Sequence, residues 1–130
     1  MDQESLLKAQ FLQKQTSEIE QNLEVVDREI NELTNLDSNL NFLINSNEKS
    51  TISVIGKGLH IKTNIESKDL FVEVGAGVVV KKTPEEAIKV IQNQIKKLTE
   101  ARLHMMNKLE IYYKTLETML NEMQHQKDGK

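Results

Sequence analysis

The sequence predicts an α+β fold, mainly α, in which a long antiparallel two-helix coiled coil carries two β-hairpins between its helices. Two observations lead to this fold class. Near both ends of the chain, apolar residues recur in alternating steps of three and four, which is the period of a coiled-coil seam. Between these stretches the period changes to two and glycines appear, as expected for short strands joined by tight turns.

The first helix is predicted over residues 1–45. Its seam positions are apolar except for Thr16 and Asp37, and no Gly or Pro interrupts them. The polar run of residues 45–50, Asn-Ser-Asn-Glu-Lys-Ser, then ends the pattern with turn-forming residues. The seam consists of Ala9, Leu12, Thr16, Ile19, Leu23, Val26, Ile30, Leu33, Asp37, Leu40 and Ile44.

Two β-hairpins are predicted over residues 51–82. Residues 52–55 and 59–65 are rich in β-branched side chains and are separated by Gly56-Lys57-Gly58. Residues 70–74 and 78–82 form a second pair around Gly75-Ala76-Gly77. Two hairpins are marginal when isolated, because their edges and one face stay uncovered. We therefore expect this insert to assemble with other subunits.

The second helix is predicted over residues 84–125, followed by a disordered tail at 126–130. Thr83 is suited to the N-cap, Pro84 to the first helical position and Glu86 to a capping box. Its seam has one polar member, Arg102. Together these parts form one predicted domain, residues 1–130. The seam consists of Ile88, Ile91, Ile95, Leu98, Arg102, Met105, Leu109, Tyr112, Leu116, Met119 and Met123.

Composition argues against several classes of function. With 0 Cys the chain has no disulfide or thiolate metal site, and His60, His104 and His125 are too scattered to suggest a metal centre. We expect no catalytic residues, no cofactor and no metal, so the chain is predicted not to be an enzyme. A net charge of -3 argues against nucleic acid, and no apolar run indicates a membrane span or signal peptide. These features fit a cytoplasmic protein.

Gly75-Ala76-Gly77 also invites comparison with a phosphate-binding loop. It lacks the full glycine spacing, the Walker lysine and a helix directly after it. A hairpin turn is the better interpretation.

Residues 70–87, Leu-Phe-Val-Glu-Val-Gly-Ala-Gly-Val-Val-Val-Lys-Lys-Thr-Pro-Glu-Glu-Ala, carry a family resemblance. This segment closely resembles the last hairpin and helix start of alpha-class prefoldin subunits of the archaeal type, and the order helix, two hairpins, helix is similar to the same class. The resemblance implies a hexamer of two alpha and four beta-class subunits whose hairpins form a β-barrel platform. It also implies an ATP-independent chaperone that holds unfolded proteins at its coiled-coil tips and delivers them to a group II chaperonin.

The alternating residues of the second hairpin are expected to face the barrel core. The predicted assembly residues are Val72, Val74, Gly75, Gly77, Val78 and Val80.

Antiparallel pairing about a turn near residue 64 places Leu6 near Glu122, Phe11 near Glu117 and Arg102 near Val26. Apolar residues near the chain ends then lie off the seam or face small partners, and an exposed apolar patch commonly marks a binding site. The predicted client-binding residues are Leu6, Leu7, Phe11, Leu116, Met119, Leu120 and Met123.

Other interpretations of these residues remain open. Leu116, Met119 and Met123 would also serve simply to complete the seam, and the N-terminal three would also fit a frayed helix end without function. A scaffolding coiled-coil subunit, in a prefoldin-like assembly or a filament, is the alternative to a chaperone.

Overall fold

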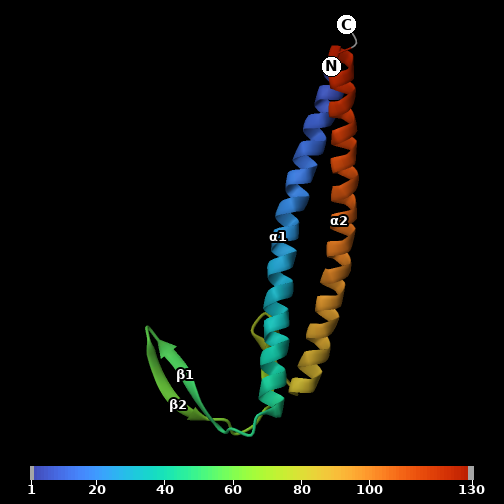
Figure 1. Cartoon of the computed structure of the whole chain (residues 1–130). Coiled ribbons are helices and arrows are strands. Elements are labelled where there is room, and N and C mark those ends of the chain that lie inside the picture. The colour runs from blue at the N-terminus through green and yellow to red at the C-terminus, as the bar shows by residue number, and fades with distance from the viewer. Residues whose placement is uncertain (1, 129–130) are drawn as a thin grey trace. The chain divides into compact units, whose positions relative to one another are not determined.

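The computed structural model describes residues 2–128, with side chains described up to residue 125. Helix α1 (Gln3–Asn45) is followed by strands β1 (Ser50–Gly56), β2 (Leu59–Asn64), β3 (Leu70–Gly75) and β4 (Val78–Lys82), and then by helix α2 (Pro84–Asp128) (Figure 1). This order confirms the predicted fold class. Helix α2 continues three residues beyond its predicted end at 125, through the start of the predicted tail. The rest of that tail lies outside the described residues.

Contacts group the chain into two compact units, each containing a stretch of both long helices. We call residues 2–32 with 96–128 the helical unit, and residues 33–95 the hairpin unit. Within each, the segments of α1 and α2 pack against each other through their seams. The single domain predicted for residues 1–130 stays a prediction.

The helical unit has a core made by the predicted seams. Ile19, Leu23 and Leu109 are buried in one cluster, and Met105 and Tyr112 pack against it. Every described seam position of both helices in this unit is at least partly buried. The steps of three and four therefore identified the faces that pack together, as an amphipathic pattern should.

The hairpin unit has a second core. Leu40 from α1 is buried with Ala87 and Ile91 from α2, and Leu70 at the start of β3 packs against this cluster with neighbouring seam residues. The second hairpin is thus fixed to the helices by its first residue. An open groove of about 380 Å³ runs along this junction, lined by side chains that include Leu36 and Val90. Leu36 and Val90, which both lie off the seams, thus line the same groove as Phe71 and Val72 of β3.

The strands form two separate two-stranded antiparallel sheets, β1–β2 and β3–β4. Register runs from Ser50 opposite Asn64 in the first and from Leu70 opposite Lys82 in the second. Each hairpin closes through a two-residue turn. In the second turn both Ala76 and Gly77 have positive φ, 51° and 75°, a geometry that matches the twist of the flanking strands.

Polar contacts fix the ends of the elements. The N–H of Glu86 donates to Oγ1 of Thr83 at 3.2 Å, which confirms the predicted N-cap of α2. At the other helix start, the N–H of Ser5 donates to Oδ1 of Asp2 at 2.8 Å, a cap that the sequence analysis missed.

The C-terminal end of α1 has no basic residue in its last turn. Lys68 supplies that charge, since its Nζ donates to the carbonyls of Ile44 and Ser46, both at 2.9 Å.

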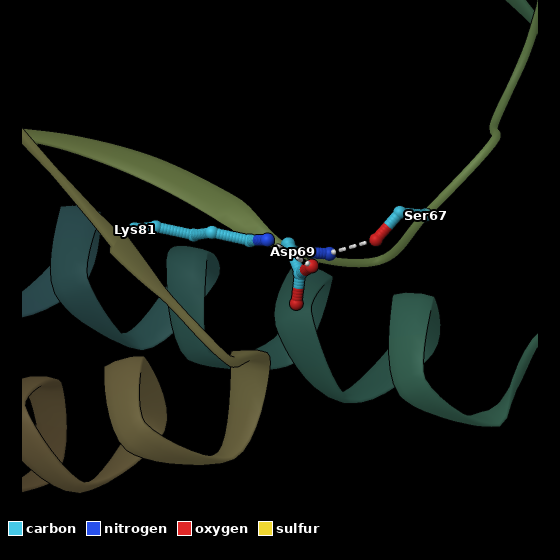
Figure 2. Close-up of polar contacts among 3 residues, drawn as sticks. All are labelled: Ser67, Asp69 and Lys81. Atoms are coloured by element: carbon cyan, nitrogen blue, oxygen red, sulfur yellow. Dashed lines mark hydrogen bonds and ion pairs between the residues drawn. The ribbon is translucent and has the colours of Figure 1, made fainter.

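The linker before β3 is also joined to the second hairpin. Lys81 Nζ lies 3.1 Å from Oδ2 of Asp69, while the N–H of Asp69 donates to Oγ of Ser67 at 3.1 Å (Figure 2). Hydrogen bonding from Lys81 first, and from Ser67 second, lowers the pKa of Asp69. The segment Ser67-Lys68-Asp69 therefore connects the end of α1 to the start of β3 and to β4.

None of the helices within residues 2–128 combines the length and the apolar character needed to cross a membrane.

Candidate functional site

An open apolar groove lies at the end of the helical unit where the first turns of α1 meet the last turns of α2. It has a volume of about 320 Å³. We call it the terminal groove. Its lining residues are Leu6, Ala9, Gln10, Gln13, Leu116, Met119, Leu120 and Met123.

The groove exists because the two seams differ in size at this end. Helix α2 keeps large side chains at Leu116, Met119 and Met123, whereas α1 places Ala9 opposite them. Farther along the unit, large residues on both helices close the seam, and Ile19 and Leu109 are each only 8% exposed. Because Ala9 is too small to cover its partners, the methionine side chains stay partly accessible.

Five of the seven predicted client-binding residues meet in this groove, and two do not. Leu6, Leu116, Met119, Leu120 and Met123 line it. The other two lie on a different face of α1.

Leu7 and Phe11 are each 60% exposed and are absent from the groove lining. Residues four apart are neighbours on one helix face, so these two form a single exposed pair. The step from Leu6 to Leu7 turns about 100° around the helix, which takes the pair off the groove side. We call Leu7 and Phe11 the outer pair. The end of the helical unit thus presents two separate apolar surfaces.

Two polar contacts join the helices farther from the chain ends than the terminal groove. Nε of Arg102 lies 2.6 Å from Oδ1 of Asp27, and the hydroxyl of Tyr113 donates to Oε1 of Glu20. The predicted register placed Arg102 near Val26, so the pairing was right to within one residue. Neither Asp27 nor Glu20 was predicted from the sequence as a partner of these side chains. Asp27 could have been predicted as the partner of Arg102, because it is the acidic residue next to Val26. Nothing in the sequence distinguishes Glu20 from the other acidic residues of α1 as the partner of Tyr113.

The predicted assembly residues of the second hairpin are mostly exposed in the single chain. Val72 is partly buried and lines the groove beside the helices, opposite Val80 in the sheet. Val74 and Val78 are 58% and 54% exposed, and Val80 is 38% exposed. Gly75 precedes the turn and Gly77 lies in it, with φ of 124° and 75°. That these residues face a barrel core stays a prediction.

Among the described residues, no group of three or more His, Asp or Glu side chains is arranged to hold a metal ion. The buried polar atom without a hydrogen-bond partner in residues 2–125 is Oδ1 of Asp37, at a seam position of the hairpin unit.

Comparisons with known proteins agree on one family. A family model described as Prefoldin subunit matches residues 12–128. The chain is 32% identical over 81 residues to Prefoldin subunit alpha of Methanosphaera stadtmanae, covering 62% of this chain and 59% of that one. It is 34% identical over 77 residues to Prefoldin subunit alpha 2 of Thermococcus kodakarensis, covering 58% and 54%. The matched segments therefore span less than two thirds of these relatives' own length.

A solved structure shares the fold. The chain is similar to one in the cryo-EM structure of filamentous PFD from Methanocaldococcus jannaschii, with a TM-score of 0.72. The match covers 93% of this chain and 99% of that one at 22% sequence identity. At this identity the likeness shows the common fold alone.

Proposed function

This chain belongs to the prefoldin family, and from that membership we propose that it is an alpha-type subunit of an ATP-independent molecular chaperone. In this proposal the ends of its helical unit hold unfolded proteins, and it catalyses no reaction. The observation that carries the proposal is the terminal groove, an apolar cleft left open to solvent at a place where a continuing seam would close it.

The chemistry of the groove suits clients that share no sequence. An unfolded chain exposes apolar side chains of many shapes, and burial of each removes apolar surface from water. Met119 and Met123 have flexible, polarizable side chains that adapt to such variety. The amides of Gln10 and Gln13 on the same lining can bond to the main chain of an extended segment.

The proposed partners follow from the family. We propose that the hairpins assemble with beta-class subunits, in a hexamer of two alpha and four beta chains, and that the assembly passes its clients to a group II chaperonin. Several weakly bound segments held at once would give high overall affinity through effective concentration. Client release would then need only that the segments leave one after another.

The direct test is to replace Leu6, Leu116, Met119, Leu120 and Met123 together with Ser. The matched control replaces Leu103 and Ile111, each 61% exposed on α2 outside the groove, with Ser. We expect the groove variant to lose suppression of aggregation of a chemically unfolded reporter protein, while the control retains it. Light scattering should show that both variants still assemble with a beta-type partner. Full suppression by the groove variant would refute the proposed site.

The outer pair is tested separately. Replacing Leu7 and Phe11 with Ser leaves the groove lining intact. A loss of suppression in this variant alone would place the client on the outer face instead of in the groove.

A scaffolding role is the second candidate, and one observation favours it: the similar solved structure is described as filamentous. Electron microscopy and light scattering of the purified chain alone discriminate between the two. Filaments without any partner, combined with no suppression of aggregation, would support the scaffold.

A further inference from the structure

We propose that Met119 and Met123 form an oxidation site through which a peroxide releases apolar segments from the terminal groove. The proposal rests on the proposed client-binding function. It adds a mode of regulation for that site.

The described methionines all lie on α2, but their surroundings differ. Met105 packs against the buried Ile19–Leu23–Leu109 cluster. Met106 is 41% exposed and belongs neither to that cluster nor to the groove lining. Met119 and Met123 are one helical turn apart, partly accessible, and both line the terminal groove. Only this last pair combines access for a small oxidant with a place in the proposed binding surface.

The chemistry needs nothing except the oxidant. The thioether sulfur attacks one oxygen of hydrogen peroxide, the O–O bond breaks, and an S=O bond forms. Sulfur loses two electrons, and the second oxygen leaves as water after taking up the proton that the attacked oxygen carried. The product, methionine sulfoxide, is polar and can be reduced back by methionine sulfoxide reductases.

Oxidation would change the groove without unfolding the chain. A sulfoxide at Met119 or Met123 places a strong hydrogen-bond acceptor among Leu6, Leu116 and Leu120, so the lining loses apolar surface. The side-chain amides of Gln10 and Gln13 lie in the same lining and can donate to the new oxygen. The buried clusters of both units contain neither methionine. The contacts within these two clusters therefore do not depend on either sulfur.

The experiment treats the whole chain, assembled with a beta-type partner, with hydrogen peroxide and compares three versions of the chain. They are the unchanged chain, a Met119→Leu and Met123→Leu variant, and a Met105→Leu and Met106→Leu variant as the matched control. Leu keeps the lining apolar but has no sulfur to oxidise, and it is close to Met in volume. Mass spectrometry of peptides locates each added oxygen, and circular dichroism monitors helix content. Suppression of aggregation measures binding.

We expect peroxide to raise the concentration needed for suppression about tenfold in the unchanged chain and in the control, in line with the apolar burial lost. The Met119→Leu and Met123→Leu variant should need the same concentration before and after peroxide, whatever its untreated value, and a sulfoxide reductase should restore the unchanged chain. Equal sensitivity of that variant, a loss of helix content on treatment, or full suppression after complete oxidation of both residues would each overturn the inference. An untreated chain that suppresses nothing would instead overturn the proposed function itself.

Discussion

At the residue scale, the contact between Tyr113 and Glu20 predicts a pH dependence in the alkaline range. The Tyr113 hydroxyl donates to a carboxylate, which favours the protonated phenol. This bond is the main cause that raises the pKa of Tyr113, with desolvation and the charge of Glu20 adding to it. Because the folded pKa lies above the unfolded one, the contact stabilises the fold fully below about pH 10 and loses its effect as pH rises through the folded pKa.

The measurement is straightforward because the chain has 2 Tyr. A Tyr112→Phe variant leaves Tyr113 alone to report by the absorbance of tyrosinate. Adding Glu20→Gln removes the negative charge, and we expect the titration midpoint to fall. A midpoint that does not move would show that Glu20 does not govern the titration of Tyr113.

The hairpin turns show what glycine placement can and cannot predict. Gly56-Lys57-Gly58 and Gly75-Ala76-Gly77 marked two turns correctly. The structure adds that Lys57 and Ala76 also have positive φ, 44° and 51°. Such backbone costs a residue with a Cβ on the order of 1 kcal/mol or more, so the composition of either turn gave no reason to expect it. The strand pairing on either side imposes this conformation.

At the element scale, the seams were predictable from spacing, and the terminal groove only in part. Period alone placed Leu12, Ile19 and Leu109 in contacts between the helices. It also identified the apolar residues near both chain ends. Leu7 and Phe11 lie outside the groove because of the rotation of α1 about its own axis relative to α2. The positions of the apolar residues in the sequence do not determine this rotation. The single apolar surface predicted from the sequence is therefore two surfaces in the structure.

Arg102 is the polar member of the α2 seam, and its replacement is the prediction at this scale. The Arg102–Asp27 pair leaves 43% and 48% of its side chains exposed, so solvent screens it. We expect Asp27→Asn to cost at most about 1 kcal/mol of stability. Arg102→Leu should instead raise the melting temperature by roughly 2–4 °C, because an apolar side chain then fills the seam.

Thermal unfolding followed by circular dichroism checks both variants under identical conditions. Replacing Lys114, whose ion pair with Glu110 is an exposed contact within α2, by Met is the matched control and should change little. A marked loss of stability in Arg102→Leu would mean that the ion pair contributes more than its exposure suggests.

At the scale of the whole molecule, the single chain leaves apolar strand surface uncovered. Ile52 and Val54 on β1 are 69% and 70% exposed, and Ile61 on β2 is 51% exposed. The register places Ile52 opposite Lys62 but Ile61 opposite Ser53, so both faces of this hairpin carry apolar side chains. The alternation in the sequence shows that these side chains are apolar, but it does not identify what would cover them. The barrel was therefore predicted only through the family resemblance.

This exposure leads to the last prediction. Replacing Ile52, Val54 and Ile61 with Ser removes apolar area that the isolated chain does not bury, so its helix content should stay unchanged. Assembly with a beta-type partner should be lost, since open strand edges and apolar faces are what subunits would cover.

The variant with Ser in the terminal groove is expected to behave in the opposite way, because it should assemble but not bind unfolded protein. If the terminal grooves of several subunits must act together, the strand variant will also need a concentration about a hundredfold higher to suppress aggregation. Light scattering and the aggregation assay on the same samples separate the two variants, and an assembled strand variant would place the subunit contacts elsewhere on the chain.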